Sequence, residues 1–492
     1  MTLPRADHLL RGLDEDQVRA VTAEAPVVRV LAGPGSGKTR VLTRRVAYRS
    51  LGGTVDSDHC LVVTFTRAAA AELSSRLAHL GIAGKVAAGT LHATAWGLLK
   101  HWWASHAMAV PAMAERDELL RRLDIPGEVG VEIGWAAARM LSPGRYEQVA
   151  SASGRLTPAA ARKAADAMDR YRSEKARRGM VDHDDVLSLC ARAFEEDAGF
   201  AQAQRWRFRH LFVDEFQDLT PLQFRLIDGW GGGDPDLFVV GDPRQAVYSW
   251  NGSDPALLEQ LHAHFPGTAT VELSRNYRCS PAIATVAASV LEGTLPALRA
   301  TRQTSGSRAS ATTARPDAAP AGVPRIHHFD SDRDEASGIA RLLRQASARG
   351  TPWSKMAVLV RTNALALSLA RRLRSVEVPV TPITFHRAKG LEFETVVVAC
   401  LEEGFAPLVH ASSPDAIAEE RRLLYVAMTR AAIELHLTWA SRRGRAVRNP
   451  SPYLSRIERE CRNISELPAT ASSAREGLRA ARAALGPLSD LG

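Results

Sequence analysis

Short hydrophobic runs alternate with stretches of helical spacing along much of this 492-residue chain. Runs rich in Val, Ile and Leu are typical of buried parallel strands, and helical spacing between them indicates covering helices. The alternation fills residues 13–100, 205–280 and 355–440, and it predicts an α/β fold built on parallel sheets. The expected strands are 27–32, 59–66, 211–213, 237–240, 356–360, 395–400 and 433–439.

Three segments depart from this alternation. Residues 100–205 are rich in Ala, Arg, Glu and Leu with few β-branched runs, so we expect a helical insertion. Residues 300–325 have low complexity and predict a loose segment. Residues 443–492 are expected to form a C-terminal tail, which is Ala- and Ser-rich beyond about residue 465.

Composition narrows the class of protein. The chain is 45% hydrophobic and 24% charged, as in ordinary soluble proteins, and it is too long for one core. Its apolar runs are too short to span a bilayer, and its first residues lack a signal-peptide pattern. The five cysteines have no metal or disulfide spacing, which favours a reducing cytoplasm. A net charge of +9 favours a polyanionic partner, although an arginine-rich composition can also arise from GC-rich coding.

The segment AGPGSGKT at 32–39 matches the phosphate-binding pattern G-x-x-x-x-G-K-[ST] between a predicted strand and a predicted helix. Glycines let backbone N–H groups approach phosphates, and the helix N-terminus favours negative charge. The lysine supplies a charge for the β- and γ-phosphates, and the threonine hydroxyl can bind Mg²⁺. The candidate residues are Gly33, Gly35, Ser36, Gly37, Lys38 and Thr39.

The run LFVDEFQD at 211–218 is an apolar strand that ends in two carboxylates. A lone Asp-Glu pair is usually a solvated strand end, but downstream of a phosphate loop it indicates metal binding and hydrolysis. We expect Asp214 to bind Mg²⁺ and Glu215 to orient and deprotonate the attacking water. The chain is therefore predicted to hydrolyse a nucleoside triphosphate with Mg²⁺.

Further motifs follow in a definite order, and the whole set resembles the UvrD/Rep/PcrA family of superfamily 1 DNA helicases. The resemblance covers roughly residues 10–100 and 180–440. It implies two RecA-like domains, 1–100 with 205–278 and then 279–442, with 100–205 as a first accessory domain. The motifs are LDEDQVRAV (13–21), TFTRAAAAEL (64–73), GTLHATAW (89–96), VDHDDVL (181–187), VGDPRQAVYSWNG (240–252), LSRNYRCSP (273–281), TFHRAKGLEF (384–393) and EERRLLYVAMTRA (419–431).

The resemblance implies further roles in ATP turnover. Gln245 is similar to a glutamine that touches the γ-phosphate and couples it to DNA. Arg278 and Arg430 are similar to two arginine fingers that reach the γ-phosphate from the second core domain and stabilise transition-state charge.

The nucleoside is expected to be adenosine. Gln17 resembles the glutamine that hydrogen-bonds adenine, and Glu392 resembles the carboxylate that holds the ribose. Tyr277 is a candidate to stack on the base, and Arg40 to cover its other face.

Single-stranded DNA is the polymer that the resemblance implies, in a groove that combines cations with aromatic faces. For Trp250 alone, burial in the core is the main alternative, but its turn-flanked position favours stacking on a base. Weaker candidates for backbone contacts are Arg361 and Asn363. The other DNA candidates are Phe65, His92, Tyr248 and His386.

The sequence departs from the family pattern in several places. Asn251 stands where arginine usually follows the stacking aromatic, and His183 stands for phenylalanine. Arg67 and Ala69 replace Asn and Lys, and Leu91 replaces Phe. The largest departure is an absence: residues 373–380 are followed directly by 381–386, where the family usually has a second accessory domain.

The resemblance implies an ATP-dependent single-stranded DNA translocase or helicase with the family's 3′→5′ polarity, used in DNA repair or recombination and acting on single strands and their junctions with duplex. Two alternatives stay open. One is a translocase subunit of a larger complex, which strips proteins from DNA or serves phage defence. The other is a DNA-sensing ATPase switch that does not move.

Overall fold

The computed structural model describes residues 6–82, 86–291 and 322–465. The chain divides into two compact units, Met1–Arg278 and Cys279–Gly492, each with its own parallel sheet. Most of the expected loose segment 300–325, and the tail beyond residue 465, lie outside the described residues.

The first unit is built on a six-stranded sheet in the order β3-β2-β6-β7-β1-β8. All its neighbouring strands pair in parallel, as the apolar runs predict. Two of its strands were not predicted: β3 is made largely of small residues, and β8 has charged or polar residues at alternate positions. The strands are β1 (Val27–Ala32), β2 (Cys60–Thr64), β3 (Ala87–Thr90), β6 (His210–Val213), β7 (Asp236–Gly241) and β8 (Ala269–Leu273).

Helices cover both faces of this sheet, and a hydrophobic core fills each side. One core includes α1 (Glu15–Thr22), α2 (Lys38–Leu51) and α3 (Arg67–His79). The other includes α4 (Leu91–Ser105), α9 (His183–Glu196) and α11 (Pro221–Gly231). The remaining helices on this side are α10 (Ala198–Arg207), α12 (Ala256–Glu259) and α13 (Leu261–His264).

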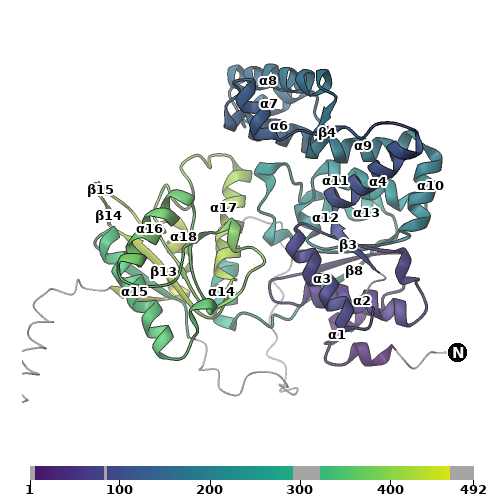
Figure 1. Cartoon of the computed structure of the whole chain (residues 1–492). Helices are drawn as coiled ribbons and strands as arrows, with labels where there is room; N and C mark the ends of the chain where they lie inside the picture. The colour runs from purple at the N-terminus through teal and green to yellow at the C-terminus, as the bar shows by residue number, and fades with distance from the viewer. Residues whose placement is uncertain (1–5, 83–85, 292–321, 466–492) are drawn as a thin grey trace, which may run out of the picture. The chain divides into compact units, whose positions relative to one another are not determined.

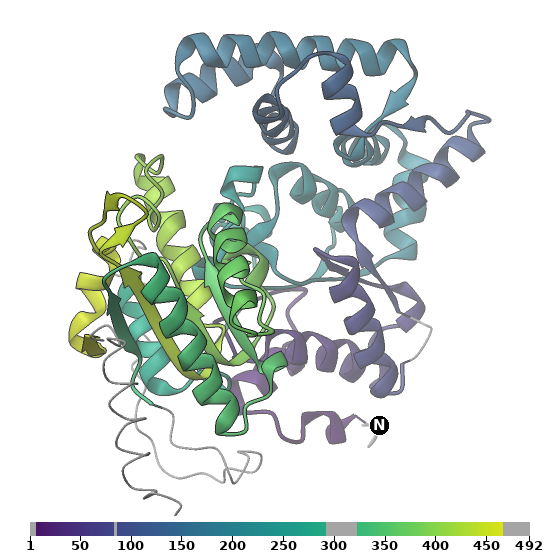
Figure 2. The same cartoon turned by 60° about the vertical axis from the view of Figure 1, so that its left-hand side comes forward.

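The helical insertion forms a further layer of the first unit with its own core. Figures 1 and 2 show α6–α8 beyond the helices that cover the sheet. Two short strands, β4 (Ala112–Met113) and β5 (Met180–Val181), pair in parallel where the chain enters and leaves this layer. Its helices are α5 (Arg116–Arg122), α6 (Gly127–Ala138), α7 (Pro143–Ala152) and α8 (Pro158–Arg177).

The motif at 181–187 fixes this insertion to the helices below it. Asp182 caps α9, and its carboxylate accepts a hydrogen bond from the Lys175 ammonium at 2.9 Å. The same ammonium lies 2.5 Å from Asp185. Burial alone raises the pKa of Asp182, but Lys175 and Arg116 beside it hold that pKa well below its usual range. The motif therefore connects α8 to α9 through a largely buried cluster of ion pairs.

The second unit is a second six-stranded parallel sheet, in the order β11-β10-β12-β13-β9-β16. Strand β16 shows that the segment expected to begin the C-terminal tail is folded as far as Ser465, because it pairs with β9. The strands are β9 (Arg325–Phe329), β10 (Met356–Val360), β11 (Ile383–Thr384), β12 (Phe393–Val398), β13 (Ala431–Ala440) and β16 (Arg462–Ser465). A small hairpin, β14 (Arg442–Arg443) and β15 (Ala446–Val447), follows β13.

Five helices accompany this sheet in the described residues: α14 (Pro281–Val290), α15 (Asp332–Ala348), α16 (Asn363–Ser375), α17 (Pro414–Met428) and α18 (Pro452–Ile457). Helix α15 and strand β10 share one hydrophobic core. Only residues 376–382, all of them described, separate α16 from β11, so no folded domain lies at this point of the chain. The two parallel sheets confirm the predicted fold class.

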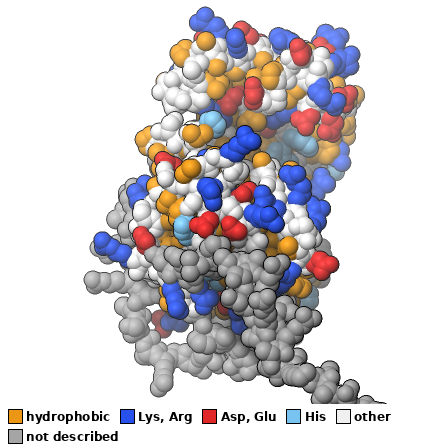
Figure 3. Space-filling view, turned by 90° about the vertical axis from the view of Figure 1, so that its left-hand side faces the viewer, with side chains coloured by type: hydrophobic (Ala, Val, Ile, Leu, Met, Phe, Trp, Pro, Cys, Tyr) orange, Lys and Arg blue, Asp and Glu red, His pale blue; other side chains and the backbone are white. Residues whose placement is uncertain are grey.

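Figure 3 shows one face of the molecule, on which Lys and Arg side chains are interspersed with Asp and Glu. The net charge of +9 is therefore not gathered into one basic patch on that face. None of the helices in residues 6–82, 86–291 and 322–465 combines the length and hydrophobicity needed to cross a bilayer.

Candidate nucleotide and DNA sites

The phosphate loop lies between β1 and α2, at the carboxyl edge of the first sheet. Gly35 and Gly37 take positive φ values of 70° and 89°, which glycine adopts without strain. The Ser36 hydroxyl donates to the Gly33 carbonyl at 2.8 Å, and the Lys38 ammonium donates to the Ala32 carbonyl at 3.1 Å. Since α2 begins at Lys38, its free N–H groups lie beside this loop.

Two other segments of the first unit hold the loop from either side. Gln17 is buried, and its side-chain amide donates to the Ser36 carbonyl at 2.9 Å. The Tyr277 N–H donates to the Gly35 carbonyl at 2.8 Å. A Cβ on Gly35 would lie 2.5 Å from the Arg278 Cβ, so only glycine fits there. The loop is thus fixed by residues far from it in sequence.

These contacts bear on the predicted adenine site. Gln17 contacts the loop itself in this structure, and its reading of adenine stays a prediction. Tyr277 is 59% exposed, and its hydroxyl donates to Asp14. The Arg40 side chain is exposed in the first turn of α2. An exposed ring and an exposed guanidinium beside the loop are compatible with stacking on a base.

Asp214 and Glu215 follow β6 at the same edge of the sheet. Burial and the neighbouring Glu215 raise the pKa of Asp214 to about 7, and the nearby Lys38 ammonium opposes this shift. Glu215 has a left-handed backbone, with φ 53° and ψ 41°, which costs a non-glycine residue about 1 kcal/mol or more. Such strain turns the chain sharply and is typical of functional sites.

The donor set fits Mg²⁺. Asp214 offers a buried carboxylate and Thr39 a hydroxyl, and oxygen ligands of this kind suit Mg²⁺, which keeps several waters and phosphate oxygens. The Asp214 carboxylate is buried beside that of Glu215, and a bound cation would stabilise the two neighbouring negative charges.

One buried residue, Gln217, joins the carboxylate site to the next strand, a role that its place in the motif did not suggest. Its amide Nε2 donates to the Glu215 carboxylate at 2.5 Å, and its Oε1 accepts from the Asp242 N–H at 2.9 Å. The Gln245 amide in turn donates to the Asp242 carboxylate at 2.7 Å. A continuous polar path therefore runs from the half-buried Glu215 through buried Gln217 and Asp242 to buried Gln245.

The segment that follows Gln245 carries Trp250 to the surface. Trp250 is 45% exposed, and Tyr248 is half-buried. Burial in the core, the alternative for Trp250, is therefore excluded. The backbone of this loop is closed by hydrogen bonds to the Tyr248 carbonyl from the N–H groups of Asn251 at 2.9 Å and Ser253 at 3.3 Å. An exposed indole at the end of the polar path suits base stacking.

Phe65 and His92 line a small cavity with Asp214, at the carboxyl ends of β2, β3 and β6. Burial and the neighbouring His183 lower the pKa of His92 to about 4. The two imidazole rings are 5.9 Å apart and nearly perpendicular. His183, which departs from the family pattern, thus packs directly on a predicted DNA-contact residue.

In the second unit the predicted residues occupy both edges of the sheet. Arg361 and Asn363 follow β10, and His386 follows β11, so all three lie at the carboxyl edge. The Arg361 guanidinium forms a double hydrogen bond with Glu420 at 2.6 and 3.0 Å, whereas Asn363 is exposed. Arg361 is therefore held by an ion pair within the unit, and its contact with DNA stays a prediction.

Glu392 and Arg430 lie at the opposite, amino edge of that sheet. Each directly precedes a strand, and the two strands pair there through Phe393 and Ala431. Arg430 is buried and donates to the carbonyl of Leu391, next to the exposed Glu392, at 3.2 Å. Glu392, predicted to hold the ribose, and Arg430, predicted to act as an arginine finger, are thus neighbours.

Arg278 differs from the expectation that both arginine fingers belong to the second core domain. It is the last residue of the first unit, and its backbone packs on Gly35 of the phosphate loop. The next residues enter the second unit beside Arg430: the Cys279 thiol donates to the Thr429 carbonyl at 3.4 Å. Arg278 therefore belongs structurally with the phosphate loop.

The two halves of the chain match two family models. Residues 13–126 and 132–266 match the UvrD/REP helicase N-terminal domain, and residues 271–383 and 377–442 match the UvrD-like helicase C-terminal domain. The two pieces of the second match overlap at 377–383, which runs from just after α16 to the first residue of β11.

Curated relatives agree with these models. ATP-dependent DNA helicase UvrD2 of Mycobacterium tuberculosis is 30% identical over 590 residues, covering 93% of this chain and 83% of the relative. UvrD1 of the same species is 30% identical over 414 residues, covering 78% and 52%. PcrA of Leuconostoc citreum is 27% identical over 398 residues, covering 77% and 51%. The alignment with UvrD2 is about 130 positions longer than the part of this chain that it covers, so the relative has additional residues there.

Proposed function

Because the chain belongs to the UvrD/REP family of ATP-dependent DNA helicases, we propose that it uses ATP and Mg²⁺ to move 3′→5′ along single-stranded DNA and to separate strands in DNA repair or recombination. Family membership makes it a DNA-dependent ATPase and helicase. The 3′→5′ polarity, the use of Mg²⁺ and the role in DNA repair or recombination are proposed in addition. We propose that the protein acts in a reducing cytoplasm, in keeping with five cysteines that lack disulfide or metal spacing.

One observation carries the proposal: the polar path from Glu215 through Gln217 and Asp242 to Gln245, followed three to five residues later by Tyr248 and the exposed Trp250. A change in charge at the hydrolysis site alters the hydrogen bonds along this path. The path ends in the segment that carries the stacking indole. Hydrolysis and grip on DNA are therefore coupled through a few side chains.

Roles in hydrolysis follow from position. Lys38 and the N–H groups of the phosphate loop bind the phosphates, and Thr39 and Asp214 would hold Mg²⁺, which neutralises phosphate charge. Glu215 orients and deprotonates the attacking water. Arg278 and Arg430 are proposed to stabilise charge on the γ-phosphate in the transition state.

The DNA contacts are proposed to use aromatic stacking together with cations. Trp250, Tyr248 and Phe65 offer ring faces, and the net charge of +9 favours a polyanion. Single strands and their junctions with duplex are the expected substrates. Affinity should fall as salt rises, with a slope of about −0.7 per neutralised phosphate.

The direct connection from α16 to β11 supports a compact motor without a second accessory domain. Such a chain lacks one contact with the duplex ahead of it. We therefore propose translocation as a monomer, with strand separation limited to short duplexes unless a second copy or a partner adds grip. Within the predicted tail 443–492, residues 443–465 are described, and their strand β16 extends the second sheet.

Two assays run in parallel test this proposal. One measures strand displacement against duplex length at less than one protein per substrate, with 3′ and 5′ single-stranded tails. The other measures displacement of streptavidin from biotinylated single strands. We expect rapid streptavidin displacement of 3′→5′ polarity and opening of short duplexes only.

Each other outcome selects an alternative. Streptavidin displacement without any strand separation favours a translocase subunit of a protein-displacing or defence complex. DNA-stimulated ATP hydrolysis without either displacement favours a DNA-sensing switch. Processive opening of long duplexes by single molecules contradicts the proposed limit.

A further inference from the structure

The loop that carries Trp250 rests on the helical insertion. Gly252 has a φ of 94°, and a Cβ at this position would lie 2.6 Å from the Cβ of Ala138 in α6. The Arg139 guanidinium lies 3.9 Å from Asp254 across the same interface. Both sides belong to the first unit. The stacking loop and the insertion are therefore in close contact.

Arg155, between α7 and α8, makes the central hydrogen bond of this contact. Its Nη2 donates to the Trp250 carbonyl at 3.2 Å. Its Nε and Nη2 also donate to the two carboxylate oxygens of Glu132 at 2.7 and 2.9 Å. Its guanidinium carbon lies 4.4 Å from the centre of the Trp135 ring. Arg155 is thus oriented by α6 on two sides.

Glu132 is itself held in place. The Tyr146 hydroxyl of α7 donates to its carboxylate at 2.7 Å. Glu132 and Arg155 have side chains only 13% and 22% exposed. Their charges compensate each other at short range. Arg155 is therefore poorly suited to bind a DNA phosphate and well suited to fix a neighbouring carbonyl.

We propose that Glu132 and Arg155 are positioning residues for DNA binding, through which the helical insertion sets the orientation of the Trp250 loop. The pair fixes the backbone of the loop, and the indole then presents its face to a base. The insertion thus contributes to the binding of single-stranded DNA through the Trp250 loop, without contacting the DNA itself. The inference rests on the proposed stacking of DNA on Trp250.

The charge of Glu132 gives a test with a distinctive sign. Removing a negative charge from a DNA-binding protein ordinarily strengthens binding. The proposal predicts the opposite for Glu132→Gln, because Arg155 loses its anchor. We expect both Glu132→Gln and Arg155→Ala to weaken binding of fluorescent oligo(dT) by about 3- to 30-fold. Unchanged or tighter binding by a folded Glu132→Gln protein overturns the proposal.

Salt dependence separates positioning from direct phosphate contact. A lost phosphate contact lowers the salt slope of single-stranded binding by about 0.7, whereas a lost positioning contact leaves the slope unchanged. A double-mutant cycle gives a second readout, because in the Trp250→Ala background Arg155→Ala should add no further loss. A reduced slope, or losses that add, shows that Arg155 binds DNA itself and overturns the proposal.

Two controls keep the result interpretable. Arg162→Ala removes an arginine of the same insertion whose side chain is 74% exposed, and it should change affinity little. Thermal unfolding followed by circular dichroism identifies a variant that fails to fold, and Arg155→Lys, which keeps a donor without the double hydrogen bond, then replaces Arg155→Ala and should recover part of the affinity. If Trp250→Ala itself binds oligo(dT) normally, the proposed stacking fails. If Trp250→Ala weakens binding and the pair's variants do not, only this inference fails.

Discussion

Each edge of the first sheet carries an exposed tryptophan with arginine nearby. The carboxyl edge also holds the phosphate loop and the polar path from Glu215, which make it the candidate functional site. Trp250, 45% exposed, lies beyond the carboxyl end of β7, and Trp206, 62% exposed, lies before the amino end of β6. At the carboxyl edge the polar path leads back to Glu215. Exposure and charge alone do not distinguish the two tryptophans. Their connection to buried polar groups does.

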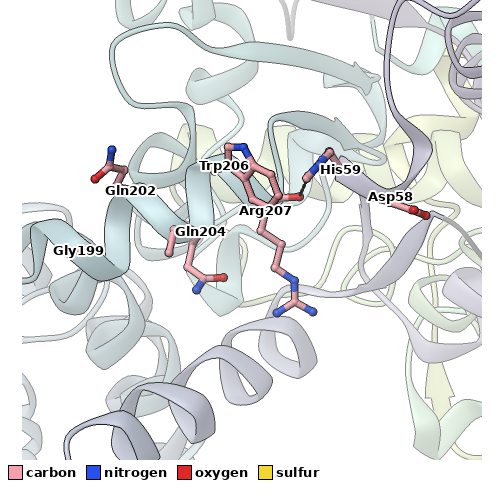
Figure 4. A pocket seen from close by; sticks show the side chains of 8 residues that line it. Asp58, His59, Gly199, Gln202, Gln204, Trp206 and Arg207 are labelled. Atoms are coloured by element: carbon pink, nitrogen blue, oxygen red, sulfur yellow. Dashed lines mark hydrogen bonds between the residues drawn. The ribbon is translucent and has the colours of Figure 1, made fainter.

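The amino edge is an open hollow of about 760 Å³, shown in Figure 4. The Trp206 ring meets the His59 ring edge-on with centroids 4.4 Å apart, and Arg209 lies 6.0 Å from the indole. The His59 ring nitrogen is 3.0 Å from the Arg207 carbonyl. These are contacts among surface groups that flank the strand starts. We therefore expect substitutions here to leave ATP hydrolysis and DNA binding unchanged.

The largest expected effect is at the carboxyl edge, for Glu215→Gln. This change keeps the shape of the side chain but removes the base, so turnover should fall by about 10²–10⁴-fold while ATP binding is retained. Steady-state hydrolysis and binding of a fluorescent ATP analogue measure the two properties. Asp58→Asn, at the amino edge, is the matched control. Turnover near the wild-type rate in Glu215→Gln would remove the catalytic assignment.

Gln217 tests the polar path itself. Gln217→Leu should break the hydrogen bonds to Glu215 and Asp242, and we expect DNA-stimulated turnover to fall on the order of tenfold or more. Gln217→Glu keeps an acceptor for the Asp242 N–H but repels Glu215, so it should impair hydrolysis as well. The measurement is the ratio of turnover with and without single-stranded DNA. An unchanged ratio in both variants means that the path does not couple the two sites.

The two tryptophans give the most direct comparison. Trp250→Ala should cost about 1–3 kcal/mol of single-stranded DNA affinity if a base stacks on the indole. Trp206→Ala removes an equally large exposed ring from the other edge and should cost nothing measurable. Fluorescence anisotropy with the same oligonucleotide measures both. Equal losses in the two variants would erase the functional difference between the edges.

The sequence predicted the fold class well because buried parallel strands are largely apolar, as in β10 and in β2 up to Val63. It missed β3, β8, β9, β11 and β16 of the two large sheets, since segments such as AAGT and RNIS become strands only by pairing with a neighbour. The phosphate loop and the Asp-Glu pair were visible because their chemistry is written in adjacent residues.

Contacts between distant residues could not be predicted in this way. Gln217 stood in a recognised motif, but nothing in its position showed that it links Glu215 to Asp242. Arg155 lies in a segment with no motif at all, and its role depends on the packing of α6 against the Trp250 loop. The ion pair of Arg361 with Glu420 likewise joins residues 59 positions apart.

The smallest expected effect is at the amino edge, where Asp236 contributes to stability rather than to turnover. Burial alone raises the pKa of Asp236, but hydrogen bonds from His210 and Arg49 outweigh it and lower that pKa to about 2. A carboxyl group whose pKa is lower in the folded state stabilises the fold above its unfolded pKa, near 3.8, and this stabilisation is lost as the pH falls toward 2.

Asp236→Asn should therefore lower the free energy of unfolding by about 1–2 kcal/mol at pH 7, after allowance for the partial exposure of the Arg49–Asp236 ion pair. The difference from the wild type should stay constant down to about pH 4 and shrink below it. Urea unfolding across this pH range measures the difference. DNA-stimulated turnover at pH 7 should match the wild type, because the ion pair lies at the edge opposite the phosphate loop. A marked loss of turnover in a stable Asp236→Asn protein would show that the amino edge also takes part in hydrolysis.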